Sequence, residues 1–197
     1  MEEEDHGGHD HGHDHGHGHD DHDHGELDFD PHTWNDPLAM AASANLLADH
    51  LSQAFPEQAS NITARNDALQ GRLTALHESF VTGLGNCTHD LVITNHEAHA
   101  YLAKRYGFEL LTLHGLAPGS EPSPATIQEV IDTIREHNIP TIFIEEGADA
   151  DALRAIQHET RVAVDVLHTL ESRPASGDYM TLQQQNLQAL RTALACS

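Results

Sequence analysis

Residues 91 to 114 read LVITNHEAHAYLAKRYGFELLTLH, which is a short apolar run, a helical segment and a second apolar run. Short apolar runs return at 141–144 (TIFI) and 162–167 (VAVDVL), with helical patterns between them. Strands that alternate with helices predict a parallel sheet with helices on both faces. We therefore expect an α/β fold with four buried strands, at 91–94, 108–113, 141–144 and 162–167.

Helical patterns accompany these strands at about 97–106, 124–138, 149–159 and 178–194. The second has the clearest start, because Ser123 can cap it and Pro124 occupies its first turn. Upstream, an Ala- and Leu-rich helix is expected over 38–55. A longer helix follows from residue 57 to about residue 84, where apolar residues recur three, four and seven positions apart.

The first 25 residues form a separate segment rich in His, Asp and Gly. They contain nine of the 19 histidines, nine acidic residues and no Lys or Arg. With almost nothing apolar to bury, the segment is expected to be disordered. Closely spaced imidazoles on a flexible chain bind zinc, copper or nickel weakly and reversibly. We interpret 1–25 as a metal-collecting segment; a purification tag is the alternative, although tags are usually plain His runs.

The net charge of −23 indicates which partners the chain favours. The chain after residue 25 contains 23 of the 32 acidic residues and all nine basic residues, so it is acidic as well. Such a surface repels phosphate backbones and anionic lipids, which disfavours nucleic acid and membrane surfaces and favours cations. We find no apolar run of about 18 residues that could span a bilayer and no N-terminal signal sequence, so we expect no direct membrane insertion.

The two cysteines, Cys87 and Cys196, lie too far apart in sequence for the close pair of a zinc ribbon or a redox motif. A long-range disulfide and two inert thiols are both compatible with this spacing. A disulfide would tie the C-terminal end to the start of the last structural unit and would imply an oxidising compartment.

Metal-binding side chains follow all four expected strands. Ligands of an open parallel sheet bind beyond the carboxyl ends of the strands, where loops and helix starts converge. The residues at these ends are Asn95-His96, His114, Glu145-Glu146 and His168. His32, in a Pro-flanked turn before the first helix, is the natural further ligand from outside the sheet. Three imidazoles, completed by water or a carboxylate, suit a tetrahedral zinc site.

The same ligands can serve catalysis, because three ligands and an open position generate hydroxide from bound water. The sequence contains no HExxH, no GxSxG and no phosphate-binding glycine loop. A His-rich segment also suits the delivery of metal better than the turnover of a substrate. We therefore favour a metal-binding protein that is not an enzyme, with an intracellular His-rich zinc or nickel storage or chaperone protein and a zinc hydrolase as alternatives.

Several segments resemble the substrate-binding proteins of zinc ABC transporters, the ZnuA-like metal receptors. DPHTWNDP at 30–37 is similar to that family's DPHxWxDP segment, which also follows a His- and acid-rich loop. NHEAHAYLAKRYG at 95–107 resembles its HxAFxYLAKRYG segment, whose leading His is a metal ligand. The order of later segments also agrees, from SEPSP at 120–124 through the strand before Glu145 to GDY at 177–179.

The resemblance implies an extracytoplasmic receptor, periplasmic or at the cell surface, that binds zinc for a high-affinity ABC uptake system and serves its membrane permease. His32, His96 and His168 are then the expected zinc ligands, with His168 at a position where many members place an Asp after the last strand. Related members with similarly placed cysteines favour the disulfide. His99 and His114 have no family role.

Members of this family have two α/β lobes joined by a long helix, with the metal in the cleft and one more His ligand early in the first lobe. This chain begins at the His-rich segment, so we expect a C-terminal portion of such a receptor. Residues 26–56 are then a remnant of the first lobe, 57–86 the long linking helix and 87–197 the α/β C-terminal lobe. Loss of the first lobe should weaken and expose the site.

Overall fold

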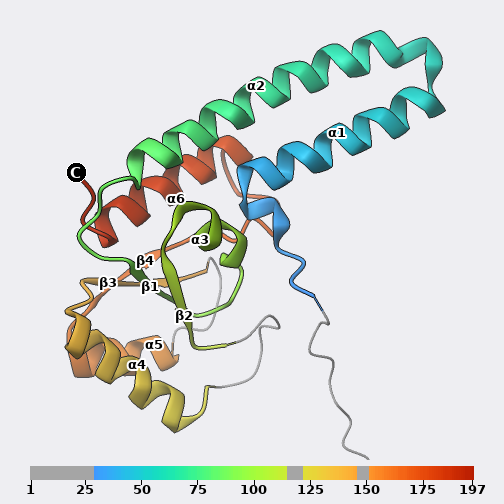
Figure 1. Ribbon diagram of the computed structural model, residues 1–197. Helices are drawn as coiled ribbons and strands as arrows, with labels where there is room; N and C mark the ends of the chain where they lie inside the picture. The colour runs from blue at the N-terminus through green and yellow to red at the C-terminus, as the bar shows by residue number, and fades with distance from the viewer. Residues whose placement is uncertain (1–28, 115–121, 146–150) are drawn as a thin grey trace, which may run out of the picture.

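Four short strands form one parallel sheet in the computed structural model, which describes residues 29–114, 122–145 and 151–197. They are β1 (Leu91–Thr94), β2 (Glu109–Thr112), β3 (Thr141–Ile144) and β4 (Ala163–Val166), in the order β2-β1-β3-β4 (Figure 1). The expected four-stranded parallel sheet is confirmed. The proposed collecting segment 1–25 and Glu146 lie outside the described residues.

The two outer strands are shorter at both ends than the sequence predicts. Phe108 and Leu113, which flank β2, are buried although they lie outside the strand, and the same holds for Val162 and Leu167 around β4. A run of apolar residues indicates which side chains are buried, whereas a strand also requires backbone hydrogen bonds to a neighbouring strand. The runs therefore extend beyond the strands that they mark.

Helices cover both faces of the sheet. They are α3 (Ala100–Tyr106), α4 (Pro124–His137), α5 (Asp151–Thr160) and α6 (Tyr179–Ala193). Neighbouring residues of a strand point to opposite faces, so Val92 of β1 and Phe143 of β3 pack in one cluster with α3 and α6. Ile93 and Ile142 pack in the other cluster, with α4 and α5. Figure 1 shows α4 and α5 on the opposite side of the sheet from α6.

The helix after β1 begins at Ala100, later than the sequence predicts. If the helix began earlier, the backbone carbonyls of His96 and Ala98 would accept hydrogen bonds within it, but here they accept from side chains. The Thr94 hydroxyl donates to the carbonyl of His96 (2.8 Å), and the Asn35 amide donates to the carbonyl of Ala98 (2.8 Å). The helix ends at Tyr106 and is followed by Gly107, whose φ of +80° is favoured by glycine. The turn at 95–99 is thus free of helix and available for a site.

A long helical hairpin precedes the sheet. It consists of α1 (Pro37–Ala54), a 3-10 turn (Pro56–Gln58) and α2 (Ala59–Gly83), and its turn projects away from the sheet (Figure 1). The end of α2 is buried in the same cluster as α3 and α6, through Leu76 and Phe80. Among the described residues, no helix combines the length and the apolar character needed to cross a bilayer.

Cys87 and Cys196 form a disulfide, which confirms that alternative. The last residues of the chain also pair with the segment that follows α2. Ser197 donates its backbone N–H to the carbonyl of Asn86 (3.0 Å), and Thr88 donates to the carbonyl of Leu194 (3.0 Å). The end of the chain is therefore fixed to the start of the α/β unit by covalent and hydrogen bonds together.

Replacement of both cysteines by alanine should lower the free energy of unfolding by about 2 to 4 kcal/mol, because the unfolded chain gains the freedom that a long closed loop removes. Denaturant unfolding of the two proteins measures this difference. A thiol reductant should destabilise the wild type and leave the double variant unchanged. Equal midpoints for the wild type with and without reductant would contradict a stabilising disulfide.

Candidate metal centre

The strand order places the site. β1 lies between β2 and β3, so the connection after β1 leads to one side of this strand and β3 lies on its other side. Open α/β sheets bind ligands in the crevice beyond the carboxyl ends of the two strands where the strand order reverses in this way, here β1 and β3. Asn95 and His96 follow β1 at this point, and Glu145 follows β3. The Asn95 amide donates to the Glu145 carboxylate (3.0 Å) and accepts from the backbone N–H of Glu145 (2.8 Å). The two strand ends are therefore joined where the ligands lie.

His32 reaches this crevice from the turn before α1. A short 3-10 helix, η1 (Thr33–Asn35), follows it and is anchored to distant parts of the chain. The Trp34 indole N–H donates to the carbonyl of Thr169 (2.8 Å), and the hydroxyl of Tyr179 donates to the carbonyl of Trp34 (2.8 Å). Gln183 of α6 donates to the carbonyl of Asn35 (3.0 Å). These bonds hold the His32 turn against the segment that joins β4 to α6.

His32, His96 and Glu171 present one ligand atom each, and these atoms all lie within 4.8 Å of one another. The Nε2 atom of His32 is 3.2 Å from a carboxylate oxygen of Glu171, and Nδ1 of His96 is 3.8 Å from the same oxygen. Both histidines are buried, whereas the Glu171 side chain is 36% exposed. Two imidazoles and one carboxylate are a ligand set that zinc uses.

Glu171 is the member of this group that the sequence analysis missed. It lies in the irregular segment after β4, where the sequence shows neither the helical nor the strand periodicity of apolar residues that would predict the position of a side chain. The only available signal is an acidic side chain shortly after a strand end. His32 and His96 are brought together as expected, with ring centroids 5.0 Å apart.

His168 is not a member of the group, although it was expected to be. Its backbone is fixed at the end of β4 by Asn186, which accepts from its N–H (2.8 Å) and donates to its carbonyl (2.9 Å). The same carbonyl accepts from Nε2 of His99 (3.2 Å). The structure thus uses the main chain of His168 to place the segment that carries Glu171.

Two further groups near the site have shifted pKa values. The hydrogen bond with His96 is the largest cause that holds the pKa of Glu145 below its ordinary value, and so this carboxylate stays ionised beside the imidazole. Burial lowers the pKa of His99 to about 4. His99 is therefore neutral at physiological pH and adds no charge that would repel a cation. His114 lies just after β2, where its backbone N–H donates to the carbonyl of Asn95 (2.9 Å). It is not a member of the ligand group.

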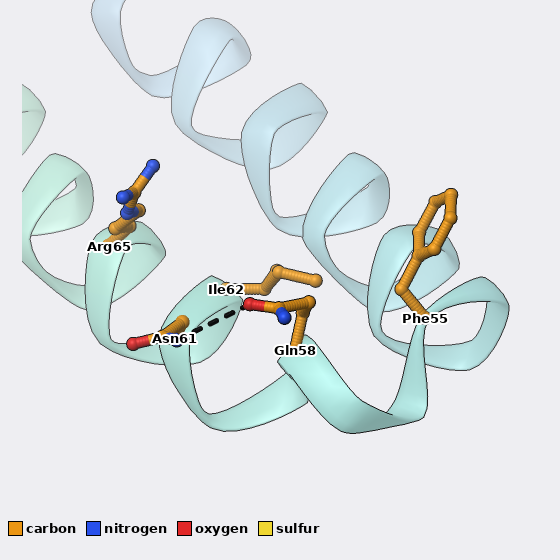
Figure 2. Close-up of a pocket in the computed structure, with 5 residues that line it drawn as sticks. All are labelled: Phe55, Gln58, Asn61, Ile62 and Arg65. Atoms are coloured by element: carbon orange, nitrogen blue, oxygen red, sulfur yellow. Dashed lines mark hydrogen bonds between the residues drawn. The ribbon is translucent and has the colours of Figure 1, made fainter.

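A surface pocket lies elsewhere, at the turn between α1 and α2. Its lining residues are Phe55, Gln58, Asn61, Ile62 and Arg65 (Figure 2). The Asn61 amide donates to the Gln58 side-chain oxygen across it (3.4 Å). Apolar side chains, two amides and a guanidinium give no anionic or imidazole ligand, so this pocket does not suit a metal ion.

Comparison with known proteins identifies the family of the chain. The family described as zinc-uptake complex component A, periplasmic, or ZnuA, matches residues 1–193. The chain belongs to the ZnuA family. The zinc-binding lipoprotein AdcA of Streptococcus pneumoniae serotype 4 is 31% identical over 194 residues, which are 96% of this chain and 37% of AdcA. The high-affinity zinc uptake system protein ZnuA of Bacillus subtilis is 31% identical over 170 residues, which are 84% of this chain and 53% of that protein.

Solved structures show the same fold. The laminin-binding protein Lbp of Streptococcus pyogenes superposes with a TM-score of 0.79 at 31% identity, covering 84% of this chain and 65% of Lbp. A Zn(II)-bound variant of AdcAII from Streptococcus pneumoniae gives a TM-score of 0.77 at 29% identity, covering 84% of this chain and 60% of AdcAII. The chain thus spans about a third to two thirds of the length of these four proteins.

Separate Glu171→Gln and His168→Gln variants decide which of the two residues is a ligand. Loss of the Glu171 carboxylate should weaken zinc binding by about tenfold or more, because a neutral amide is a poor replacement for an anionic ligand. The His168 variant should keep the wild-type affinity, since this residue contributes no atom to the group of His32, His96 and Glu171. Competition with a chromophoric chelator measures both constants. The reverse ranking would restore His168 as the ligand.

Proposed function

We propose that this chain is the zinc-binding part of an extracytoplasmic receptor, which captures zinc and passes it to the membrane permease of an ABC uptake system. The observation that carries the proposal is the group formed by His32, His96 and Glu171 at the crevice beyond β1 and β3 in a chain of the ZnuA family. Relatives whose names describe zinc binding and zinc uptake support zinc as the cargo. The receptor binds and releases its cargo and performs no reaction on it.

The ligands act together in a simple way. Each imidazole offers a lone pair only when it is neutral, and the Glu171 carboxylate supplies negative charge when it is ionised. Protons therefore compete with zinc, so affinity falls as the solution becomes acidic. Burial of His32 and His96 limits the freedom of both rings before the ion arrives, and this lowers the entropic cost of binding. The exposed side of Glu171 gives the ion a way in and out.

The His-rich segment 1–25 serves this site as a collector. Its nine histidines and nine acidic residues attract cations and supply imidazole and carboxylate ligands for them. Weak sites on the segment raise the local concentration of zinc near the buried ligands. The segment therefore changes how much zinc is near the site and not how tightly the site holds it.

The Cys87–Cys196 disulfide supports a place outside the cytoplasm. Disulfides persist in oxidising compartments such as the bacterial periplasm and the cell surface and are rare in the cytosol. This argues against the alternative of an intracellular storage or chaperone protein. The family description as periplasmic points the same way.

Calorimetric titration with zinc tests the proposal in three proteins: the whole chain, the His96→Ala variant and a variant that lacks residues 1–25. The whole chain should show one tight site and several weak ones. His96→Ala should lose most tight binding, because it removes a buried ligand, while the shortened variant should lose only weak sites. Equal effects of the two changes, or no tight site in the whole chain, would contradict a receptor site at His32, His96 and Glu171.

A further inference from the structure

Asp30 makes two contacts with His32 through a single oxygen atom. Its Oδ1 accepts the backbone N–H of His32 (2.9 Å) and lies 2.7 Å from Nδ1 of the imidazole. The Asp30 side chain is 17% exposed and the His32 side chain 5%, so water screens this contact only weakly. Asp30 itself is outside the ligand group, which consists of His32, His96 and Glu171.

Both ring nitrogens of His32 lie near a carboxylate, and the difference between the two contacts favours one position for the proton. A neutral imidazole has one donor and one acceptor nitrogen, and an ionised carboxylate only accepts. Nδ1 lies 2.7 Å from Asp30, whereas Nε2 lies 3.2 Å from the more exposed Glu171 carboxylate, so the shorter and more buried contact favours the proton on Nδ1. Nε2 is then the nitrogen with the lone pair. The ring thus presents a metal-binding atom to the group before any ion binds.

The Asp30 segment is itself fixed in place. The Tyr101 hydroxyl of α3 donates to the carbonyl of Asp30 (3.1 Å), and the backbone N–H of Thr33 donates to the carbonyl of Pro31 (2.8 Å). The Nδ1 atom of His96 has a longer carboxylate contact, 3.3 Å to Glu145. The 2.7 Å contact between Asp30 and Nδ1 of His32 is thus the shorter of the two contacts that a carboxylate outside the ligand group makes with a ligand imidazole.

We infer that Asp30 is a positioning residue for the metal: it holds His32 in the Nδ1–H tautomer, aims Nε2 at the ion and makes this nitrogen a stronger ligand. The inference rests on the proposed zinc-binding function. A carboxylate behind a ligand imidazole raises the basicity of the ligand nitrogen, and its removal typically weakens metal binding by about 10- to 100-fold. Asp30→Ala removes both the charge and the acceptor, whereas Asp30→Asn keeps an acceptor and removes the charge.

The experiment has two readouts on the whole chain. Competition with a chelator measures zinc affinity in the wild type, Asp30→Asn and Asp30→Ala, and we expect affinity to fall in that order. Nitrogen NMR of the metal-free proteins, above the ordinary titration range of histidine, reports the tautomer of each imidazole. The His32 signal, identified by its loss in His32→Gln, should show Nδ1–H in the wild type and lose this preference in Asp30→Ala.

Asp178→Ala is the matched control. Asp178 caps α6 by accepting from the backbone N–H of Thr181 (2.9 Å), so its loss lowers stability without touching His32. This control should keep both the zinc affinity and the His32 tautomer. Wild-type affinity in Asp30→Ala, or an unchanged His32 tautomer, would overturn the role of Asp30. Absence of tight binding in the wild type would instead overturn the proposed function, while the tautomer readout would still test the contact between Asp30 and His32.

Discussion

The contact between Arg105 and Asp36 fixes the start of the helical hairpin against α3. The Asp36 carboxylate is almost fully buried and accepts from the Arg105 guanidinium at 2.6 Å through both oxygens. One of these oxygens also accepts from the backbone N–H of Leu38 and so caps α1. A buried carboxylate is costly unless it is paired in this way, so the start of the hairpin has one favourable position against α3. That position brings His32, shortly before Asp36, to the end of β1.

Buried amides then complete the site. The side chains of Asn35, Gln183 and Asn186 are fully buried, and each donates to a backbone carbonyl of a segment that carries or flanks a ligand. A buried amide without a partner is costly, so these bonds favour one arrangement of the irregular segments over others. The ligand atoms of His32 and Glu171 are thus positioned by polar contacts. The apolar clusters on the two faces of the sheet position the strands.

The sequence predicted the parts of the fold that depend on periodicity and on side-chain burial. β1 and β3 lie where their apolar runs lie, and the cap of α4 at Ser123 is as expected, because a hydroxyl and the following proline act locally. The rule that parallel strands bind ligands beyond their carboxyl ends pointed to His96. His32 was expected from its Pro-flanked turn and from the family resemblance of residues 30–37. Glu171 could not be found in this way. Its position depends on hydrogen bonds between residues far apart in sequence, such as that from Trp34 to Thr169, which no local pattern encodes.

The disulfide also separates the ligands by their place in the covalent structure: two lie within the loop that it closes and one lies outside it. Cys87 and Cys196 close the chain between them into a ring that contains His96 and Glu171, whereas His32 and the hairpin belong to an arm that enters the ring from outside. A single cut of the backbone within the ring would leave both of its ligands in one covalent molecule. A cut in the hairpin would leave His32 attached only by noncovalent contacts. The integrity of the site after limited proteolysis therefore depends on the arm, and the α/β unit can be nicked without losing a ligand.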